Sequence, residues 1–249
     1  MKILLSGCCG HMGKEVARTA AELFKDADII AGVDAMKDDS CSFPVAASFD
    51  EADTSADVII DFSHHSMTNA LLDFAVKNGM PLVLATTGQT DEERDAIMNA
   101  SKKIPLFFAS NYSMGVALLI EMAKKVAAAM PGAEIEIIEK HHDRKVDAPS
   151  GTALSIAKAI QTVRENATIV TGRSGDNTKR TKEEIGICSV RMGNIVGEHE
   201  VLIGTPNQTI SLKHEAHSRA LFAEGAIQAA QFLVSQGAGL YTMDDLVSF

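Results

Sequence analysis

The chain has 249 residues, of which 46% are hydrophobic, and a formal net charge of -10. A chain of this length can bury a substantial core, in one large domain or in two smaller ones. The acidic balance argues against a broad surface for nucleic acid or anionic membranes, but it leaves room for a focused basic pocket that binds a small anion.

The cysteines and the N-terminus bear on where the protein works. Cys8 and Cys9 are adjacent whereas Cys41 and Cys188 stand alone, which matches neither a disulfide framework nor paired zinc ligands. The apolar run at residues 3–5 is too short for a signal peptide, and no segment approaches the roughly 20 apolar residues of a membrane span. We therefore expect a cytoplasmic protein with no metal site and no nucleic-acid or membrane partner.

The first 110 residues alternate short apolar runs with amphipathic stretches. The runs predict strands at residues 2–6, 28–33, 58–62, 82–85 and 106–109. The stretches predict helices at residues 12–24, 68–78 and 91–101. This βαβ rhythm predicts an α/β domain with a parallel, helix-covered sheet of the Rossmann-like type.

The pattern changes after residue 111. We expect helices at residues 115–130, 151–165 and 220–235, and strands at residues 134–139, 186–191, 198–203 and 209–214. Residues 171–184 are rich in glycine and charge and are typical of a loop. The second half therefore predicts a separate α+β domain, residues 112–216, built on a mixed or antiparallel sheet, after a dinucleotide-binding domain at residues 1–111.

A glycine-rich turn joins the first predicted strand to the first predicted helix. Gly7, Gly10 and Gly13 permit a tight turn, so that backbone N–H groups can meet a pyrophosphate at the helix N-terminus. Cys9 stands where the usual dinucleotide fingerprint has its second glycine, which leaves an ordinary strand-to-helix turn as an alternative. Asp34, at the end of the next strand, favours the dinucleotide because its carboxylate can accept hydrogen bonds from the adenosine ribose.

Two later loops follow predicted strands of the same sheet. In an open α/β sheet such loops face the ligand crevice, so their small and polar residues can line the nicotinamide half of a cofactor. Each loop taken alone is equally consistent with a simple connection. The residues concerned are Ala85, Thr86 and Thr87 in one loop and Ala109, Ser110, Asn111 and Tyr112 in the other.

A third loop, residues 61–65, contains two histidines but no third ligand at metal-binding spacing, and a surface loop is the better interpretation.

The segment from residue 136 to residue 153, EIIEKHHDRKVDAPSGTA, concentrates chemistry in a short stretch. His141, His142 and Lys145 follow a predicted strand, where a histidine can exchange protons near neutral pH and a cation can stabilise developing negative charge. Ser150, Gly151 and Thr152 then open a predicted helix, whose N-terminus can bind a carboxylate or a phosphate. Each feature alone suits a surface or capping role, but together they predict proton transfer on an anionic substrate.

This segment resembles the signature of the 4-hydroxy-tetrahydrodipicolinate reductases, also called dihydrodipicolinate reductases, of lysine and diaminopimelate biosynthesis. The resemblance extends over nearly the whole chain and in the family's order. It includes GCCGHMG at residues 7–13, ATTG at 85–88, NYS at 111–113, IVGEH at 195–199 and HSR at 217–219.

The resemblance implies an enzyme that transfers hydride from NADH or NADPH to the cyclic product of dihydrodipicolinate synthase, with release of water. It implies His141 as proton donor and acceptor, Lys145 as proton donor, and a dicarboxylate bound by His142, Ser150, Gly151 and Thr152. The cofactor-contacting positions that it implies are Gly7, Cys8, Cys9, Gly10, His11, Met12, Asp34, Ala85, Thr86, Thr87, Ala109, Ser110, Asn111 and Tyr112.

The family's fold further implies that residues 217–249 return to complete the nucleotide domain. The second domain would then build a homotetramer, and a hinge would allow closure over the substrate.

Some residues depart from the family's pattern. Cys9 replaces a common glycine, and Tyr112 replaces a common phenylalanine conservatively. Ala35 and Met36 follow Asp34 where relatives that use NADPH can carry an arginine for the 2′-phosphate, and the Asp34 carboxylate would repel that phosphate. We therefore expect NADH to be preferred, with NADPH possible because Lys37 can partly compensate.

Two other interpretations of the sequence remain open. A different two-domain oxidoreductase acting on another small carboxylate would keep the fold and change the substrate. A nucleotide-binding regulatory protein would bind the cofactor without turnover, although the presence of both His141 and Lys145 argues against it.

Overall fold

The computed structural model describes residues 1–36, 41–176 and 178–247. The chain divides into two compact units. One unit contains Met1–Ser113 together with Ala220–Phe249, and the other contains Met114–Arg219. No helix within the described ranges combines the length and apolar character needed to cross a membrane.

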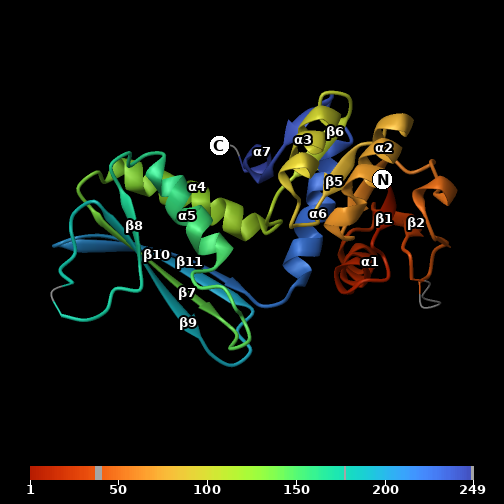
Figure 1. Ribbon diagram of the computed structural model, residues 1–249. Coiled ribbons are helices and arrows are strands. Elements are labelled where there is room, and N and C mark those ends of the chain that lie inside the picture. The colour runs from red at the N-terminus through yellow and green to blue at the C-terminus, as the bar shows by residue number, and fades with distance from the viewer. Residues whose placement is uncertain (37–40, 177, 248–249) are drawn as a thin grey trace. The chain divides into compact units, whose positions relative to one another are not determined.

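The first unit contains a seven-stranded, fully parallel sheet in the order β12-β6-β5-β4-β1-β2-β3 (Figure 1). The strands are β1 (Lys2–Ser6), β2 (Asp28–Val33), β3 (Val45–Ala46), β4 (Val58–Asp61), β5 (Leu82–Leu84), β6 (Pro105–Phe108) and β12 (Gly239–Tyr241). The predicted strands appear within a few residues of their expected bounds. The two short edge strands, β3 and β12, were not predicted, because runs of two or three residues show no periodicity.

Helices cover both faces of this sheet. They are α1 (His11–Leu23), α2 (Thr68–Asn78), α3 (Asp91–Ala100), α6 (Ala220–Leu233) and α7 (Met243–Leu246), with 3-10 turns at Phe49–Glu51 and His65–Met67. Side chains of α2 and α3 join one cluster with alternate strand residues such as Leu4, Ile59 and Leu82. Helix α6 packs on α1 and on β4, β5 and β6. Because successive strand residues point to opposite faces and both faces are covered, almost every residue of the central strands β1, β4 and β5 is buried.

The second unit contains a mixed five-stranded sheet in the order β11-β10-β7-β9-β8. Its strands are β7 (Glu134–His141), β8 (Thr168–Thr171), β9 (Glu184–Arg191), β10 (Gly197–Thr205) and β11 (Gln208–Ala216). Strand β10 is antiparallel to β7 and β11, whereas β9 is parallel to β7 and β8. The mixed sheet agrees with the prediction for this part of the chain. Strand β8 was missed, and it ends at Thr171, the first residue of the segment expected to be a loop.

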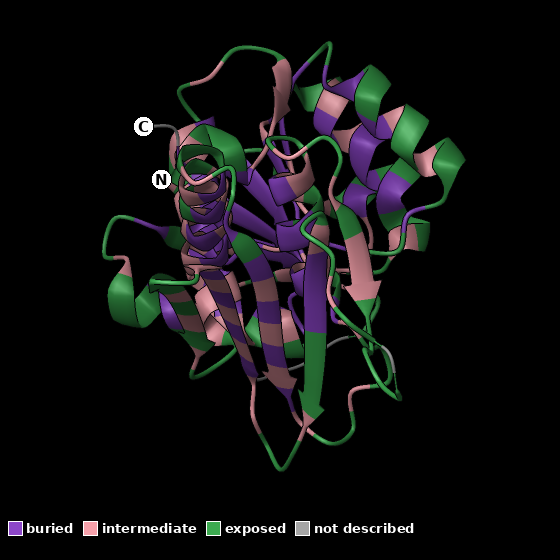
Figure 2. Ribbon diagram, turned by 90° about the vertical axis from the view of Figure 1, so that its left-hand side faces the viewer, coloured by how far each residue is buried: buried purple, intermediate pink, exposed green. Residues whose placement is uncertain are grey.

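Helices α4 (Met114–Ala129) and α5 (Gly151–Gln161) lie together on one face of this sheet (Figure 1). Alternate residues of β7 and β10 are buried against them, which Figure 2 shows as purple bands between pink ones along the strands. Helix α5 ends at Gln161, four residues earlier than predicted, and the chain continues in turns through Arg164. The guanidinium of Arg164 donates to the carbonyl oxygens of Ala127, Met130 and Ala133, so it caps the end of α4 instead of extending α5.

Candidate active site

The glycine loop, residues 7–13, is held tightly between β1 and α1. Gly7 has a φ of 73°, and a Cβ placed on it would lie 2.6 Å from the backbone carbon of Phe62. A Cβ on Gly13 would lie 2.2 Å from the carbonyl oxygen of Gly7. Both positions therefore require glycine. Helix α1 begins after Gly10 without a side-chain cap, so its first N–H groups remain available for an anion.

Asp34 ties this loop to the end of β2. One carboxylate oxygen accepts a hydrogen bond from the backbone N of Cys9 at 2.9 Å, and the other accepts one from the backbone N of Met36 at 2.9 Å. Gly7, Gly10 and Asp34 line a cavity of about 340 Å³ at the carboxyl edge of the sheet. The side chains of Cys8 and Cys9 are buried behind the loop. Lys37, which we expect to compensate for NADPH, lies outside the described residues.

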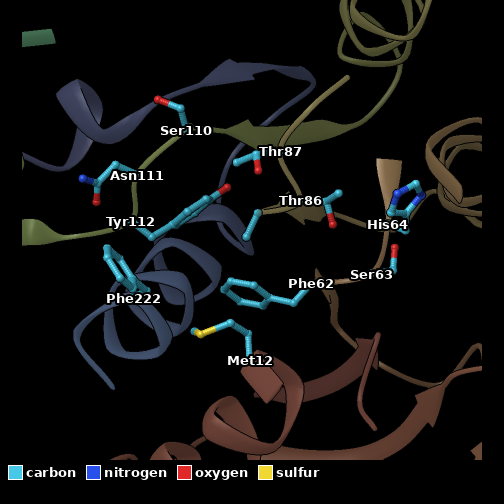
Figure 3. A pocket seen from close by; sticks show the side chains of 11 residues that line it. Met12, Phe62, Ser63, His64, Thr86, Thr87, Ser110, Asn111, Tyr112 and Phe222 are labelled. Carbon is cyan, nitrogen blue, oxygen red and sulfur yellow. The ribbon is translucent and has the colours of Figure 1, made fainter. Parts of the chain in front are cut away.

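A second cavity, of about 390 Å³, lies further along the same edge (Figure 3). Phe62, Ser63 and His64 line both cavities. The predicted cofactor residues that line the second one are Met12, Ala85, Thr86, Thr87, Ser110, Asn111 and Tyr112. Cys8, Cys9, His11 and Ala109 line neither of these two cavities. The strand-end loops thus converge as their position after parallel strands predicts.

The floor of the second cavity is fixed by buried hydrogen bonds. The hydroxyl of Tyr112 donates to the carbonyl oxygen of Leu84, at 2.8 Å, and contacts that of Phe107 at 3.2 Å. The hydroxyl of Thr86 donates to the buried carboxylate of Asp61 at 2.6 Å. Burial raises the pKa of Asp61 against the effect of its hydrogen bonds. The tyrosine in place of the family's common phenylalanine is therefore accommodated by carbonyl acceptors already present.

Phe62, Ser63, His64 and Phe222 line the second cavity but were not predicted as site residues. The first three could have been found, because their loop follows a parallel strand just as the predicted loops do. Phe222 lies on α6, far away in sequence, and only the return of the C-terminal segment to this unit brings it there.

In the second unit, Glu139 and His141 occupy the end of β7 and share its buried face. The fully buried carboxylate of Glu139 lies 2.5 Å from Nδ1 of His141 and accepts two hydrogen bonds from Arg191, at 2.7 and 2.9 Å. The register explains this arrangement, since Arg191 on β9 lies directly opposite His141. The strand pairing therefore assembles a buried, hydrogen-bonded triad of Arg191, Glu139 and His141.

The electrostatics of this triad determine which of its atoms carry protons. Burial alone would raise the pKa of Glu139, but the hydrogen bonds from Arg191, Ser189, His141 and the Ser150 backbone lower it to about 2. Burial lowers the pKa of His141, and Glu139 opposes this effect only in part. At neutral pH an ionised Glu139 thus accepts the Nδ1 proton of a neutral His141, which leaves Nε2 to exchange a proton.

Ser150 and His199 support the same site. The Ser150 hydroxyl lies 3.0 Å from Nε2 of His199 and caps α5 by accepting from the backbone N of Ala153 at 3.2 Å. Burial, followed by the nearby His141, lowers the pKa of His199 to about 4. The Ser150 hydroxyl is thus engaged in the fold, and His199 is a supporting residue that was not predicted as a site residue, although it lies in the IVGEH motif.

The loop between β7 and α5 holds the remaining predicted residues. Lys145 forms an ion pair with Asp147, N to O 2.7 Å, and this contact is the first cause of a lowered pKa for Asp147, to which the backbone of Gly151 also contributes. The buried Nδ1 atom of His142 has no hydrogen-bond partner among the described residues. Gly151 and Thr152 form the first turn of α5. A carboxylate, that of Asp147, thus already meets Lys145 and the N-terminus of α5.

Comparison with known proteins identifies the family. Models of the dihydrodipicolinate reductase N-terminus and C-terminus match residues 1–112 and 115–247. Proteins named 4-hydroxy-tetrahydrodipicolinate reductase from Caldanaerobacter subterraneus subsp. tengcongensis and Clostridium novyi are 46% and 43% identical, each over 99% of this chain and 98% of the relative. The chain belongs to the dihydrodipicolinate reductase family.

A solved relative shows the same fold. The dipicolinate-bound dihydrodipicolinate reductase from Paenisporosarcina sp. TG-14 has a TM-score of 0.83 and 25% identity, with 99% of both chains covered. The family and the fold class predicted from sequence are therefore confirmed. More distant dehydrogenases, such as the probable dehydrogenase from Thermotoga maritima with a TM-score of 0.66 and 9% identity, share the fold alone.

Proposed function

We propose that this dihydrodipicolinate reductase family member reduces 4-hydroxy-tetrahydrodipicolinate to tetrahydrodipicolinate with NAD(P)H, in lysine and diaminopimelate biosynthesis. The observation that carries the proposal is the buried triad of Arg191, Glu139 and His141. In a protein of this family, this triad presents a neutral imidazole next to an anion site. The full-length relatives bear the name of this activity.

The first unit fits a pyridine nucleotide. Bound NADH or NADPH would supply the hydride. The uncapped N-terminus of α1 and the space kept by Gly7 and Gly13 suit the pyrophosphate, and Asp34 suits the adenosine ribose. The small residues around the second cavity suit the nicotinamide half. We assign cofactor contact to residues 7–12, Asp34, residues 85–87 and residues 109–112. Cys8, His11 and Ala109 contribute through the backbone, and Cys9 contributes by holding the Asp34 carboxylate with its N–H.

His141 and Lys145 are assigned the proton transfers. His141 is oriented by Glu139, so that its Nε2 atom accepts or donates a proton while Nδ1 keeps its hydrogen bond. Lys145 is a half-buried cation next to the N-terminus of α5. It can donate a proton to the substrate as negative charge develops there, once its ion pair with Asp147 opens.

A substrate carboxylate is assigned to the place now taken by the Asp147 carboxylate. That carboxylate contacts Lys145 and the backbone of Gly151, the two kinds of donor that a substrate carboxylate requires. Thr152 in the same turn and the unsatisfied Nδ1 of His142 provide further polar contacts. In this assignment Ser150 supports the site without contacting the substrate carboxylate, because its hydroxyl caps α5 and its backbone N–H donates to Glu139.

A coupled assay tests the activity. Oxidation of NADH and NADPH is followed with freshly generated product of dihydrodipicolinate synthase, under conditions in which this product does not decay. We expect turnover with both cofactors. No turnover with either one would refute the proposed function, and hydride transfer to another small carboxylate but not to this substrate would indicate a different oxidoreductase.

Variants separate the assigned roles. His141→Gln and Lys145→Ala should lower kcat by about 100-fold or more, because both residues act in the transition state. Lys145→Ala should also raise KM, because Lys145 contacts the substrate carboxylate in this assignment. Thr152→Val should mainly raise KM. Arg144→Ala is the matched control for Lys145→Ala, since Arg144 is an exposed cation in the same loop that pairs with Asp143. The reverse pattern of kcat and KM effects would contradict the assignment.

The five-stranded sheet also suggests how the protein assembles. The face of the five-stranded sheet opposite α4 and α5 carries half-buried side chains such as Ile138 and Leu202, and this surface suits packing against other copies. We propose a cytoplasmic homotetramer formed through this second, substrate-binding unit. Light scattering of the purified protein at assay concentration would reveal a mass other than four chains if this is wrong.

A further inference from the structure

Three of the four cysteines lie together behind the glycine loop. The sulfur atoms of Cys8, Cys9 and Cys41 are all within 4.8 Å of one another. Cys8 and Cys9 are buried and Cys41 is half-buried, and none of them forms a disulfide. The linear spacing of these cysteines predicts no metal site, because Cys41 is far from the pair in sequence. The fold brings it to them past the end of β2.

The sulfur positions suit a shared metal ion. Sγ of Cys8 and Sγ of Cys9 are 3.9 Å apart. Two thiolates that bind one Zn²⁺ at about 2.3 Å with tetrahedral geometry are separated by roughly 3.8 Å. Neighbouring cysteines can therefore ligate one ion almost without moving, and Cys41 lies within reach as a third ligand.

The electrostatics of the cluster also favour a cation. Burial is the main cause that raises the pKa of the Cys8 thiol, and Cys9, Cys41 and Asp34 raise it further. These neighbours all disfavour negative charge on the Cys8 sulfur because they can carry negative charge themselves. A cation bound among the three sulfurs would offset these repulsions, because each thiolate would then lie next to a positive charge.

We propose that Cys8, Cys9 and Cys41 form a binding site for one thiophilic metal ion such as Zn²⁺. Three thiolates select soft or borderline ions over Mg²⁺ and Ca²⁺, which require oxygen ligands. The site is distinct from the groups assigned to proton transfer, since all three sulfurs belong to the first unit and His141 and Lys145 belong to the second. A bound ion would fix Cys9, whose backbone N–H is held by Asp34, and so stiffen the glycine loop.

A titration with Cd²⁺ tests the site directly. The full-length protein is reduced with a phosphine, stripped of metal with a chelator, and titrated while the ultraviolet thiolate-to-metal charge-transfer band is recorded. We expect one Cd²⁺ per chain, and we expect Zn²⁺ to compete for the site only in large excess, because thiolates bind the softer Cd²⁺ more tightly. Cys41→Ser and Cys9→Gly should each weaken binding by at least about 100-fold, because losing a direct ligand costs more than losing an outer-shell partner.

Cys188→Ser is the matched control, since Cys188 is an exposed cysteine on β9 of the other unit and should leave the titration unchanged. Circular dichroism of each variant establishes that it is folded, and Cys9→Gly keeps the test decisive if Cys41→Ser does not fold. Absence of the band, or a band that survives both substitutions in folded protein, overturns the proposal. The titration uses no substrate, so its outcome is independent of the proposed reductase activity.

Discussion

The glycine loop of the first unit and the segment between β7 and α5 of the second are both assigned to an anion, yet they are built differently. The loop depends on backbone shape, because Gly7 and Gly13 leave no room for a Cβ and α1 begins without a side-chain cap. The second segment depends on buried charge, because Glu139 is held by Arg191, by His141 and by the backbone of Ser150. The first region should therefore be sensitive to added volume and the second to lost charge.

The largest effect is expected from Glu139→Gln. This change leaves Arg191 without its carboxylate partner in a buried setting, and it faces His141 with a neutral amide in place of the carboxylate that fixes its tautomer. Breaking a buried pair on one side costs several kcal/mol, so we expect the free energy of unfolding to fall by about 3 kcal/mol. We also expect kcat to fall by about 100-fold, since His141 loses its orientation. Urea unfolding and steady-state kinetics measure the two effects.

Glu136→Gln is the control for that change, because Glu136 lies on the same strand but on the half-buried face. It should leave kcat near the wild-type value. If Glu139→Gln lost stability but kept both kcat and the pH dependence of kcat, Glu139 would be a purely structural residue and would not position His141.

A smaller effect is expected from Gly7→Ala. The new Cβ would meet the backbone of Phe62 at a φ of 73°, which L-residues rarely adopt. Strain of this kind costs on the order of 1–3 kcal/mol, and the displaced loop should weaken NADH binding, measured by fluorescence titration. Gly237→Ala is the control, because a Cβ there meets nothing within 4 Å. Unchanged NADH affinity in Gly7→Ala would remove the loop from the cofactor site.

These two regions also differ in what the sequence could predict. The glycine spacing and the loops after parallel strands predicted part of the lining of both cavities of the first unit, because topology alone brings such loops to one edge. The motif at residues 136–153 predicted the local chemistry of the second unit. Arg191 and His199 were not predicted as site residues, because they reach Glu139 and Ser150 only through strand register, which single-sequence patterns do not determine.

The pH dependence of stability offers a finer test of the buried charges. Burial lowers the pKa of His199 to about 4 in the folded protein, below its ordinary value of 6.5. Between these values the unfolded chain binds a proton that the folded chain does not, so stability falls as pH drops from 6.5 to 4. We expect His199→Gln to remove about 2–3 kcal/mol of that decline, measured by urea unfolding at pH 7 and pH 4.5.

His217→Gln serves as the control for that comparison, since His217 is exposed and should leave the decline unchanged. An identical decline in His199→Gln and in the wild-type protein would mean that His199 does not stay neutral when buried. The lowered pKa of Glu139, about 2, adds a separate loss of stability only below about pH 4.5, where the unfolded glutamate takes up its proton.

The smallest effect concerns the adenosine end of the cofactor, where the charge of Asp34 sets the preference between NADH and NADPH. We expect kcat/KM for NADH to exceed that for NADPH by about tenfold, equivalent to about 1.4 kcal/mol, because Asp34 would repel a 2′-phosphate. The carboxylate is held in place by the backbone N atoms of Cys9 and Met36, so it cannot easily turn away. Asp34→Asn should narrow the preference while keeping one acceptor for these donors, and Asp28→Asn, at the other end of β2, should not. Comparable kcat/KM values for the two cofactors in the wild-type protein would show that Asp34 does not repel the 2′-phosphate of NADPH.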